Sequence, residues 1–113
     1  MQIKEFEGLT ITLSDGDTNK LKESWQKQHW RCIVYNKIKR KQMGFDIYGD
    51  GGYNSVMNPK LALLHYLEDA VYYMDEEPYE KAKDRKAGEN AYFKCRKFIG
   101  TDDDIISLYR KLI

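Results

Sequence analysis

Residues 30–48 read WRCIVYNKIKRKQMGFDIY, and this stretch decides the fold. In residues 30–35 and again in residues 43–48, every second side chain would point to the same face of a strand. This alternation is typical of strands that bury one face. The residues between them begin with Asn36-Lys37, a polar turn sequence, and continue with basic residues. The stretch therefore predicts a β-hairpin.

The N-terminal residues extend this hairpin into a sheet. Leu9, Ile11 and Leu13 alternate strictly with polar side chains, and Gly8 marks the turn of a preceding hairpin. Residues 18–28 are rich in Lys, Glu, Ser and Gln, so they form either a short surface helix or a solvated loop. We predict a small antiparallel sheet made of the N-terminal strands and the 30–48 hairpin.

Helix signals follow the strand region. Asn58 caps free amides and Pro59 suits the first helical position, so a helix is expected from here to about Met74. Asp84 is a candidate cap for a second helix. Thr101 and Asp104 have the spacing of a capping box that opens a last helix. The face predicted for the second helix consists of Ala87, Ala91, Cys95 and Phe98.

Strands followed by helices, without alternation, indicate an α+β fold in which the antiparallel sheet is packed against the C-terminal helices. A chain of 113 residues has the usual length of one domain, so residues 1–113 are expected to form a single domain. Hydrophobic residues make up 42% and charged residues 33%, which is a globular composition and excludes wholesale disorder.

The charge balance and the absence of targeting signals limit the possible partners. Nineteen basic and eighteen acidic residues give a net charge of +1, which removes the long-range field of a general nucleic-acid or membrane binder. No apolar stretch approaches the roughly 20 residues that span a bilayer, and Met1 precedes mixed polar sequence. We expect a cytoplasmic protein without a membrane partner, whose oligomeric state is open.

Catalytic and metal-binding patterns are missing from the sequence. His29, His65, Cys32 and Cys95 have no paired short-range spacing, so no metal or other cofactor is expected. Both cysteines occupy positions that pattern as core, which predicts two buried free thiols, with a single disulfide as the alternative. These absences favour a binding protein over an enzyme.

An acidic and aromatic segment is the candidate partner-binding site. Carboxylates accept bidentate hydrogen bonds from arginine, and tyrosines bury a large area at interfaces. The predicted residues are Glu68, Asp69, Tyr72, Asp75, Glu76, Glu77, Tyr79 and Glu80. Asp102, Asp103 and Asp104 either extend this surface or favour a helix N-terminus. Ordinary solvation of a helix is the alternative interpretation of the carboxylates.

A basic hairpin tip is the second candidate site. Its residues are Lys37, Lys39, Arg40 and Lys41. They could contact phosphates if Tyr35 or Tyr48 offered a stacking surface nearby. A solvated turn is the other interpretation, so nucleic acid ranks behind protein as the expected partner.

Three segments resemble a family of small phage and prophage proteins. These are MGFDIYG from Met43, ALLHYLEDAVYYM at 62–74, and RKAGENAYFKC at 85–95, followed by a hydrophobic helical tail. Leu67, Asp69 and Ala70 match the first helix of the family, whereas the residues matching its next helix are Arg85, Lys86, Ala87, Tyr92 and Cys95. Between the helices, Pro78-Tyr79-Glu80 replaces the Phe-x-x-Trp/Phe and Gly-Tyr-Asp stretch of the family.

The resemblance covers about two thirds of the chain and implies a phage origin more firmly than an activity. Small phage proteins of this kind are often accessory or anti-defence proteins, including inhibitors of CRISPR nucleases. The resemblance therefore implies an inhibitor that occludes a host defence protein, such as a CRISPR effector, in the host cytoplasm. A nucleic-acid-binding accessory protein of phage replication or recombination is the alternative.

Overall fold

The computed structural model describes residues 1–50, 57–75 and 82–113, which divide into two compact units. Met1–Leu63 contains a four-stranded sheet and the first turn of helix α1. Leu64–Ile113 contains the remainder of α1 together with helices α2 and α3. The predicted α+β class, with an antiparallel sheet followed by helices, is confirmed.

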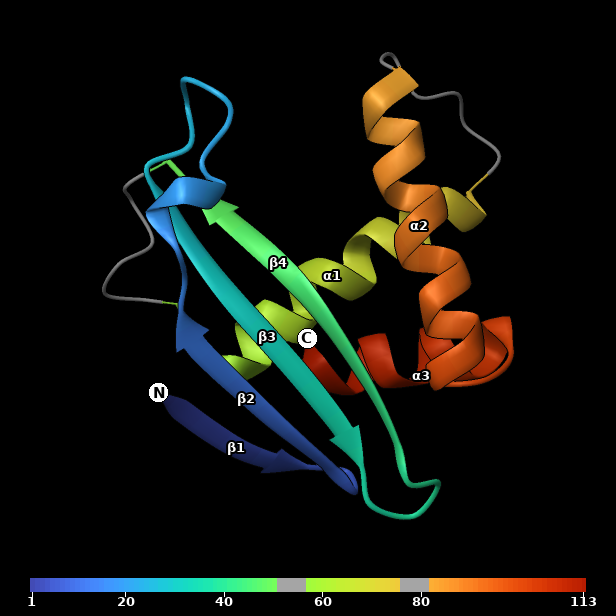
Figure 1. Ribbon diagram of the computed structural model, residues 1–113. Helices are drawn as coiled ribbons and strands as arrows, with labels where there is room; N and C mark the ends of the chain where they lie inside the picture. The colour runs from blue at the N-terminus through green and yellow to red at the C-terminus, as the bar shows by residue number, and fades with distance from the viewer. Residues whose placement is uncertain (51–56, 76–81) are drawn as a thin grey trace. The chain divides into compact units, whose positions relative to one another are not determined.

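The sheet is an antiparallel meander in the order β1-β2-β3-β4 (Figure 1). Its strands are β1 (Gln2–Phe6), β2 (Leu9–Asp15), β3 (Gln28–Asn36) and β4 (Lys41–Gly49). Glu7 and Gly8 link β1 to β2 with φ angles of 52° and 79°, the positive values that a two-residue type I′ turn requires. Both hairpins expected from the sequence are thus confirmed.

The register of the strands separates a buried face from an open face. Two cross-strand rows, Ile11–Val34–Met43 and Leu13–Cys32–Phe45, are buried throughout. The row between them, Thr12–Ile33–Gly44, points to the opposite face because successive side chains of a strand alternate. A shift of one residue would exchange the two faces, so burial of these rows fixes the register.

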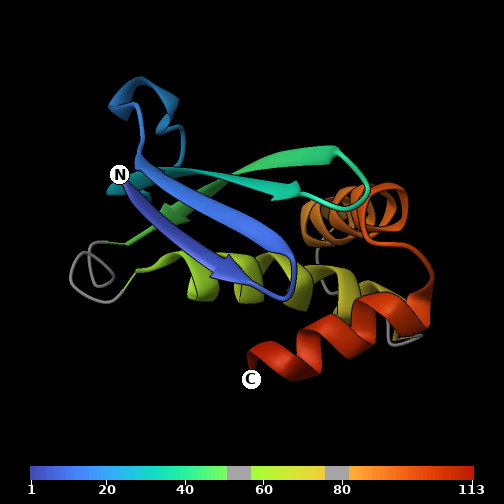
Figure 2. The same cartoon turned by 90° about the horizontal axis from the view of Figure 1, so that it is seen from below.

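Residues 16–27 form a compact loop with a short 3₁₀ helix, η1 (Thr18–Lys20), between β2 and β3. Figure 2 shows η1 standing out at one end of the sheet. The Gln26 side-chain oxygen accepts the amide hydrogens of Lys22 and Glu23 at 2.7 and 3.0 Å. Of the two structures expected for residues 18–28, only one turn of helix forms, and a hydrogen-bonded loop follows it.

The helices are α1 (Pro59–Met74), α2 (Ala82–Phe98) and α3 (Asp102–Leu112). The Asn58 Oδ1 accepts the amide hydrogen of Leu61 at 2.9 Å, so α1 has the predicted cap and the predicted end. The Thr101 hydroxyl accepts the amide hydrogen of Asp104 at 3.2 Å, and the Asp104 carboxylate accepts that of Thr101 at 2.9 Å. The predicted capping box of α3 is therefore confirmed.

Helix α2 departs from the sequence prediction in its start and in its buried face. It begins at Ala82, so Asp84 lies inside the helix and does not precede it. Ala87, expected in the core, is exposed. The buried stripe consists of Gly88, Ala91, Cys95 and Phe98, at steps of three, four and three residues. The prediction failed at Ala87 because Ala87 and Gly88 are adjacent and both small, and the helical period is compatible with burial of either residue.

The capping box gives a test of the stability of α3. Thr101→Ala removes the acceptor for the Asp104 amide, and loss of a threonine cap costs about 1 kcal/mol. We expect the free energy of unfolding, measured by urea titration with circular dichroism, to fall by that amount. Ser107→Ala, at an exposed position inside the same helix, is the control and should change stability little. Equal effects from both substitutions would contradict the role of the cap.

Candidate functional site

In the part of the chain that the structure describes, few side chains have the geometry of a catalytic or metal-binding site. There, no group of three or more His, Cys, Asp or Glu side chains is placed to hold a metal ion, and no helix could cross a membrane. Cys32 and Cys95 are free and buried, as predicted. Desolvation raises the pKa of each thiol to about 12, so both are protonated at neutral pH and are poor nucleophiles.

His29 and Asp46 form the pair that comes nearest to catalytic geometry. His29 Nε2 lies 2.9 Å from Asp46 Oδ1, and a carboxylate in this position can orient a catalytic imidazole. However, the backbone amide of Asp17 donates to His29 Nδ1 at 2.9 Å. Because an amide can only donate, Nδ1 is the acceptor, and Nε2 carries the proton donated to Asp46. Both ring nitrogens are thus occupied, and neither can accept a proton from a substrate.

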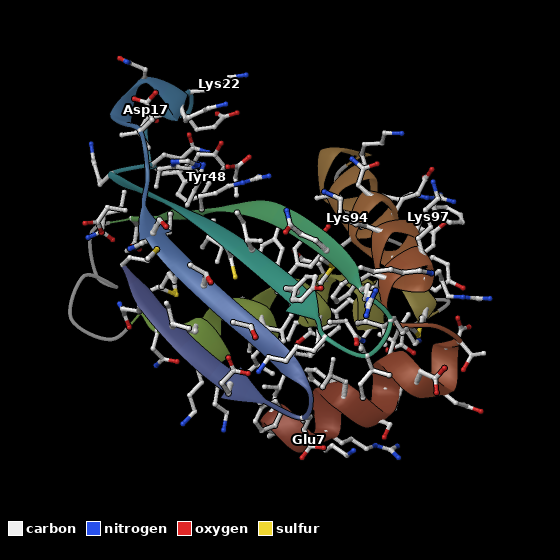
Figure 3. All side chains as sticks on the ribbon, turned by 60° about the horizontal axis from the view of Figure 1, so that its bottom comes forward. Glu7, Asp17, Lys22, Tyr48, Lys94 and Lys97 are labelled. Carbon is white, nitrogen blue, oxygen red and sulfur yellow. The ribbon has the colours of Figure 1, made fainter. Side chains whose placement is uncertain are left out.

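The surroundings of His29 support a structural role. Gly16 donates its amide hydrogen to the His29 carbonyl at 2.7 Å, and a Cβ on Gly16 would collide with the imidazole. The Tyr48 ring lies 5.0 Å from the imidazole, and Figure 3 shows Asp17 and Tyr48 at the same end of the sheet. We call Gly16, Asp17, His29 and Asp46 the histidine latch, because they fasten the 16–27 loop to β3 and β4. No local pattern in the sequence predicted this cluster.

Opposing effects set the ionisation of Asp46. Desolvation raises the pKa of its carboxyl, but the hydrogen bond from His29 and the nearby Arg31 guanidinium, 3.4 Å away, lower it by more. The net result is a pKa below the ordinary value. Asp46 is therefore an acceptor that stays ionised in the folded protein, as the histidine latch requires.

Three of the predicted partner-binding residues, Glu68, Asp69 and Tyr72, lie along one side of α1, and a fourth, Asp75, directly follows the helix. Tyr72 follows Glu68 by four residues and Asp69 by three, so these side chains are neighbours on the helix. The amide of Asp75 donates to the Tyr72 carbonyl at 3.2 Å, just after the last helical residue. Tyr72 is 55% exposed, Asp69 and Asp75 are exposed, and Glu68 is half-buried. We call these four residues the α1 stripe.

Tyr109 of α3 is electrostatically linked to the α1 stripe, although it was not among the predicted site residues. Desolvation raises the pKa of Tyr109, and the charges of Glu68 and Tyr72 contribute to the same shift. Glu68 also contacts His65 Nδ1 at 3.5 Å, a long contact on the same helix. Tyr109 is therefore a second tyrosine to consider beside Tyr72.

The other predicted acidic residues fall into two groups. Glu76, Glu77, Tyr79 and Glu80 lie outside the described residues. Asp102 accepts hydrogen bonds from the Tyr92 hydroxyl at 2.7 Å and from Arg96 at 2.9 Å. Asp104 closes the capping box of α3. Of the two interpretations of this aspartate run, these contacts favour the start of a helix.

The basic tip between β3 and β4 is a closed turn. The Asn36 side-chain oxygen accepts the amide hydrogens of Ile38 and Lys39, each at 3.0 Å. Lys37 Nζ lies 2.7 Å from Glu5 Oε2, so this cation already faces a carboxylate. Of the two tyrosines considered as stacking surfaces, Tyr48 pairs with His29 at the opposite end of the hairpin, whereas Tyr35 pairs with Gln42 beside the tip and is 38% exposed.

The two cysteines give a test of the absence of an activated thiol. With pKa values of about 12 and no exposure, both thiols should resist iodoacetamide at pH 8 in the native protein. Mass spectrometry should find both alkylated only after the protein is unfolded in guanidinium. Rapid labelling of either cysteine without denaturant would contradict this assignment.

The histidine latch gives a pH-dependent test. The pKa of Asp46 is lower in the folded than in the unfolded protein, so its contribution to stability is present above the unfolded value of about 4 and is lost as pH falls through the folded value. Asp46→Asn should therefore lower stability at pH 7, and the difference from wild type should shrink below pH of about 4. Urea titrations at a series of pH values measure this, with exposed Glu23→Gln as the control. A difference that stays constant with pH would contradict the latch.

Comparisons with known proteins do not extend these observations. No family model, no curated protein and no solved structure matches this chain. The resemblance to small phage proteins consequently stays a prediction. The candidate site rests on the residues and their geometry alone.

Proposed function

We propose that this protein is a binding protein that acts without catalysis, by occupying a basic surface of a partner protein with the α1 stripe. The observation that carries the proposal is a half-exposed tyrosine, Tyr72, between two carboxylates: Glu68 on the same side of α1 and Asp75 directly after the helix. Tyrosines are enriched in the central contacts of interfaces, and charged groups surround them at the rim.

The chemistry of the stripe selects a cationic partner. Carboxylates on a helix side accept paired hydrogen bonds from arginine, and their fixed spacing along the helix suits a row of such groups. Tyr72 and Tyr109 add apolar area with few torsions to freeze, and tyrosine hydroxyls can form hydrogen bonds with the partner. A groove lined by arginine, of the kind that holds nucleic acid, has the complementary charge.

The class of partner is proposed from the resemblance to phage proteins. It favours an effector of a host defence system as the partner, and in particular a CRISPR effector nuclease, whose nucleic-acid groove is basic. Occupation of that groove would block substrate binding with one inhibitor per effector. The proposal thus combines a physical feature, the α1 stripe, with a partner class that only the resemblance implies.

The basic tip carries less weight as a site for nucleic acid. Of its predicted residues, Lys37 is paired with Glu5. Of the two aromatic residues considered for stacking, Tyr48 is at the far end of the sheet and only Tyr35 lies beside the tip. A tip that binds phosphate would show affinity that falls steeply with salt concentration. Salt-dependent affinity for nucleic acid therefore distinguishes the two candidate functions, because occlusion by the α1 stripe needs a protein partner.

The test is a pull-down and a cleavage assay with a purified effector nuclease loaded with its guide. Complex formation and loss of cleavage are expected for the wild type. The double variant Tyr72→Ala/Asp75→Lys should weaken binding at least about tenfold, because it removes an aromatic contact and reverses a charge at the centre of the stripe.

The matched control is Trp25→Ala/Glu23→Lys, which makes the same change of charge and also removes a half-exposed aromatic, in the 16–27 loop. It should bind like the wild type. Equal losses in both variants would place the contact elsewhere, whereas an absence of complex with a panel of effectors would remove the partner class.

A further inference from the structure

A second surface, on α2, combines cations with an exposed aromatic ring. Lys86, Asn90, Phe93 and Lys97 follow at steps of four, three and four residues, so they form one row along the helix. All four are exposed, and Lys94 lies beside Phe93 and is exposed too. We call these five residues the α2 row, and Figure 3 labels Lys94 and Lys97 on it.

Phe93 is the informative residue of the row. Its side chain is 53% exposed, although it belongs to a helix with a complete buried stripe on another side. The rings of Tyr92 and Tyr73 lie 5.2 and 6.2 Å from its ring, and the Tyr92 ring meets it edge to face. These contacts hold the ring in place while about half of the side chain stays exposed, so Phe93 is available for stacking.

The charge of α2 has the sign that phosphates require. Residues 82–98 include six basic and two acidic side chains in a chain whose net charge is only +1. Interaction with the helix dipole explains cations in the last turn, and Arg96 there is paired with Asp102. It does not explain Arg85 and Lys86 near the amino end, where the dipole favours anions. Glu89 lies 3.9 Å from Lys86 Nζ, a long contact that leaves this cation 69% exposed.

We propose that the α2 row is a binding surface for single-stranded nucleic acid, in which Phe93 stacks on a base and Lys86, Lys94 and Lys97 contact phosphates. A positively charged track beside an aromatic platform is the usual design for binding single strands. Lys86 and Lys97 are eleven residues apart, which corresponds to roughly 16 Å along the helix and spans several nucleotides. Asn90 adds an amide between the cations that can form hydrogen bonds with a base edge.

A single strand fits this surface better than a duplex does. In a duplex the bases are stacked on one another and their faces are not accessible, so Phe93 would have no partner. An acidic protein would satisfy the lysines but would offer no base for the exposed Phe93 side chain to stack on. The α2 row shares no residue with the α1 stripe and has the opposite charge, so the two proposals stand independently.

The experiment measures fluorescence anisotropy of labelled oligothymidylate and oligouridylate with the full-length protein at several salt concentrations. Binding that weakens as salt rises is expected for one or both single strands, and much weaker binding is expected for a labelled DNA hairpin duplex. Lys94→Ala/Lys97→Ala should reduce the magnitude of the slope of log affinity against log salt by about 1.4, because each phosphate that a lysine neutralises on a single strand contributes roughly 0.7 to that slope.

Phe93→Leu separates stacking from packing. Leucine keeps an apolar side chain against Tyr73 and Tyr92 but has no π face, so affinity should fall at least about fivefold while the melting temperature changes little. Phe93→Trp should restore or strengthen binding. If Phe93→Leu unfolds the protein, Phe93→Trp and the lysine variant still report on the surface.

The matched control is Lys20→Ala/Lys22→Ala, which removes the same charge from exposed positions in the 16–27 loop. It should bind like the wild type. The proposal is overturned by absence of binding to both single strands at low salt, by equal losses in the loop and α2 variants, or by duplex binding as tight as that of single strands. Binding to labelled polyglutamate but not to either oligonucleotide would instead identify an acidic protein partner and would also overturn it.

Discussion

The rotation of each helix about its own axis is the constraint on which both candidate surfaces depend. In α2, burial of Gly88, Ala91, Cys95 and Phe98 fixes that rotation, because a helix of this composition has only one stripe that can leave water. Phe93 and Lys97 must then face outward. In α1 the burial of Leu67 and Ala70 likewise directs Tyr72 outward, and Glu68 shares its side. The core of the helical unit therefore determines which functional groups the protein presents.

The sheet unit is ordered by a different kind of interaction. Its register follows from buried cross-strand rows, but the loop between β2 and β3 has few apolar side chains to hold it. The histidine latch holds this loop instead, through hydrogen bonds at both nitrogens of His29, one of them to the ionised Asp46. His29 and Asp46 have the arrangement of a catalytic pair, but here their role is structural, because both imidazole nitrogens are already engaged in hydrogen bonds. Among the described residues, this commitment is the strongest physical reason against acid–base catalysis at the sheet.

Most of the fold could be predicted from local sequence, whereas the sites could be predicted only in part. Alternation in Leu9, Ile11 and Leu13 indicated the strand, and Asn58 and Thr101 indicated two helix starts, because each signal lies within a few residues. The histidine latch could not be found in this way, since Asp17 and Asp46 reach His29 from 12 and 17 residues away and only the register joins them. Phe93 was not singled out, although the predicted face of Ala91, Cys95 and Phe98 already placed it on the opposite side of the helix, because its ring contacts with Tyr73 come from another helix.

According to the proposed function, the protein occupies a surface of its partner and does not turn over a substrate. The most direct measurement is a titration of a fixed amount of loaded effector nuclease, at a concentration far above the dissociation constant, with increasing amounts of the purified protein. Residual cleavage should fall linearly and reach its minimum at equal molar amounts, and dilution of the complex should restore it. Complete inactivation by a small fraction of one equivalent, persisting after the protein is removed, would show that it modifies its target catalytically and would contradict a binding role.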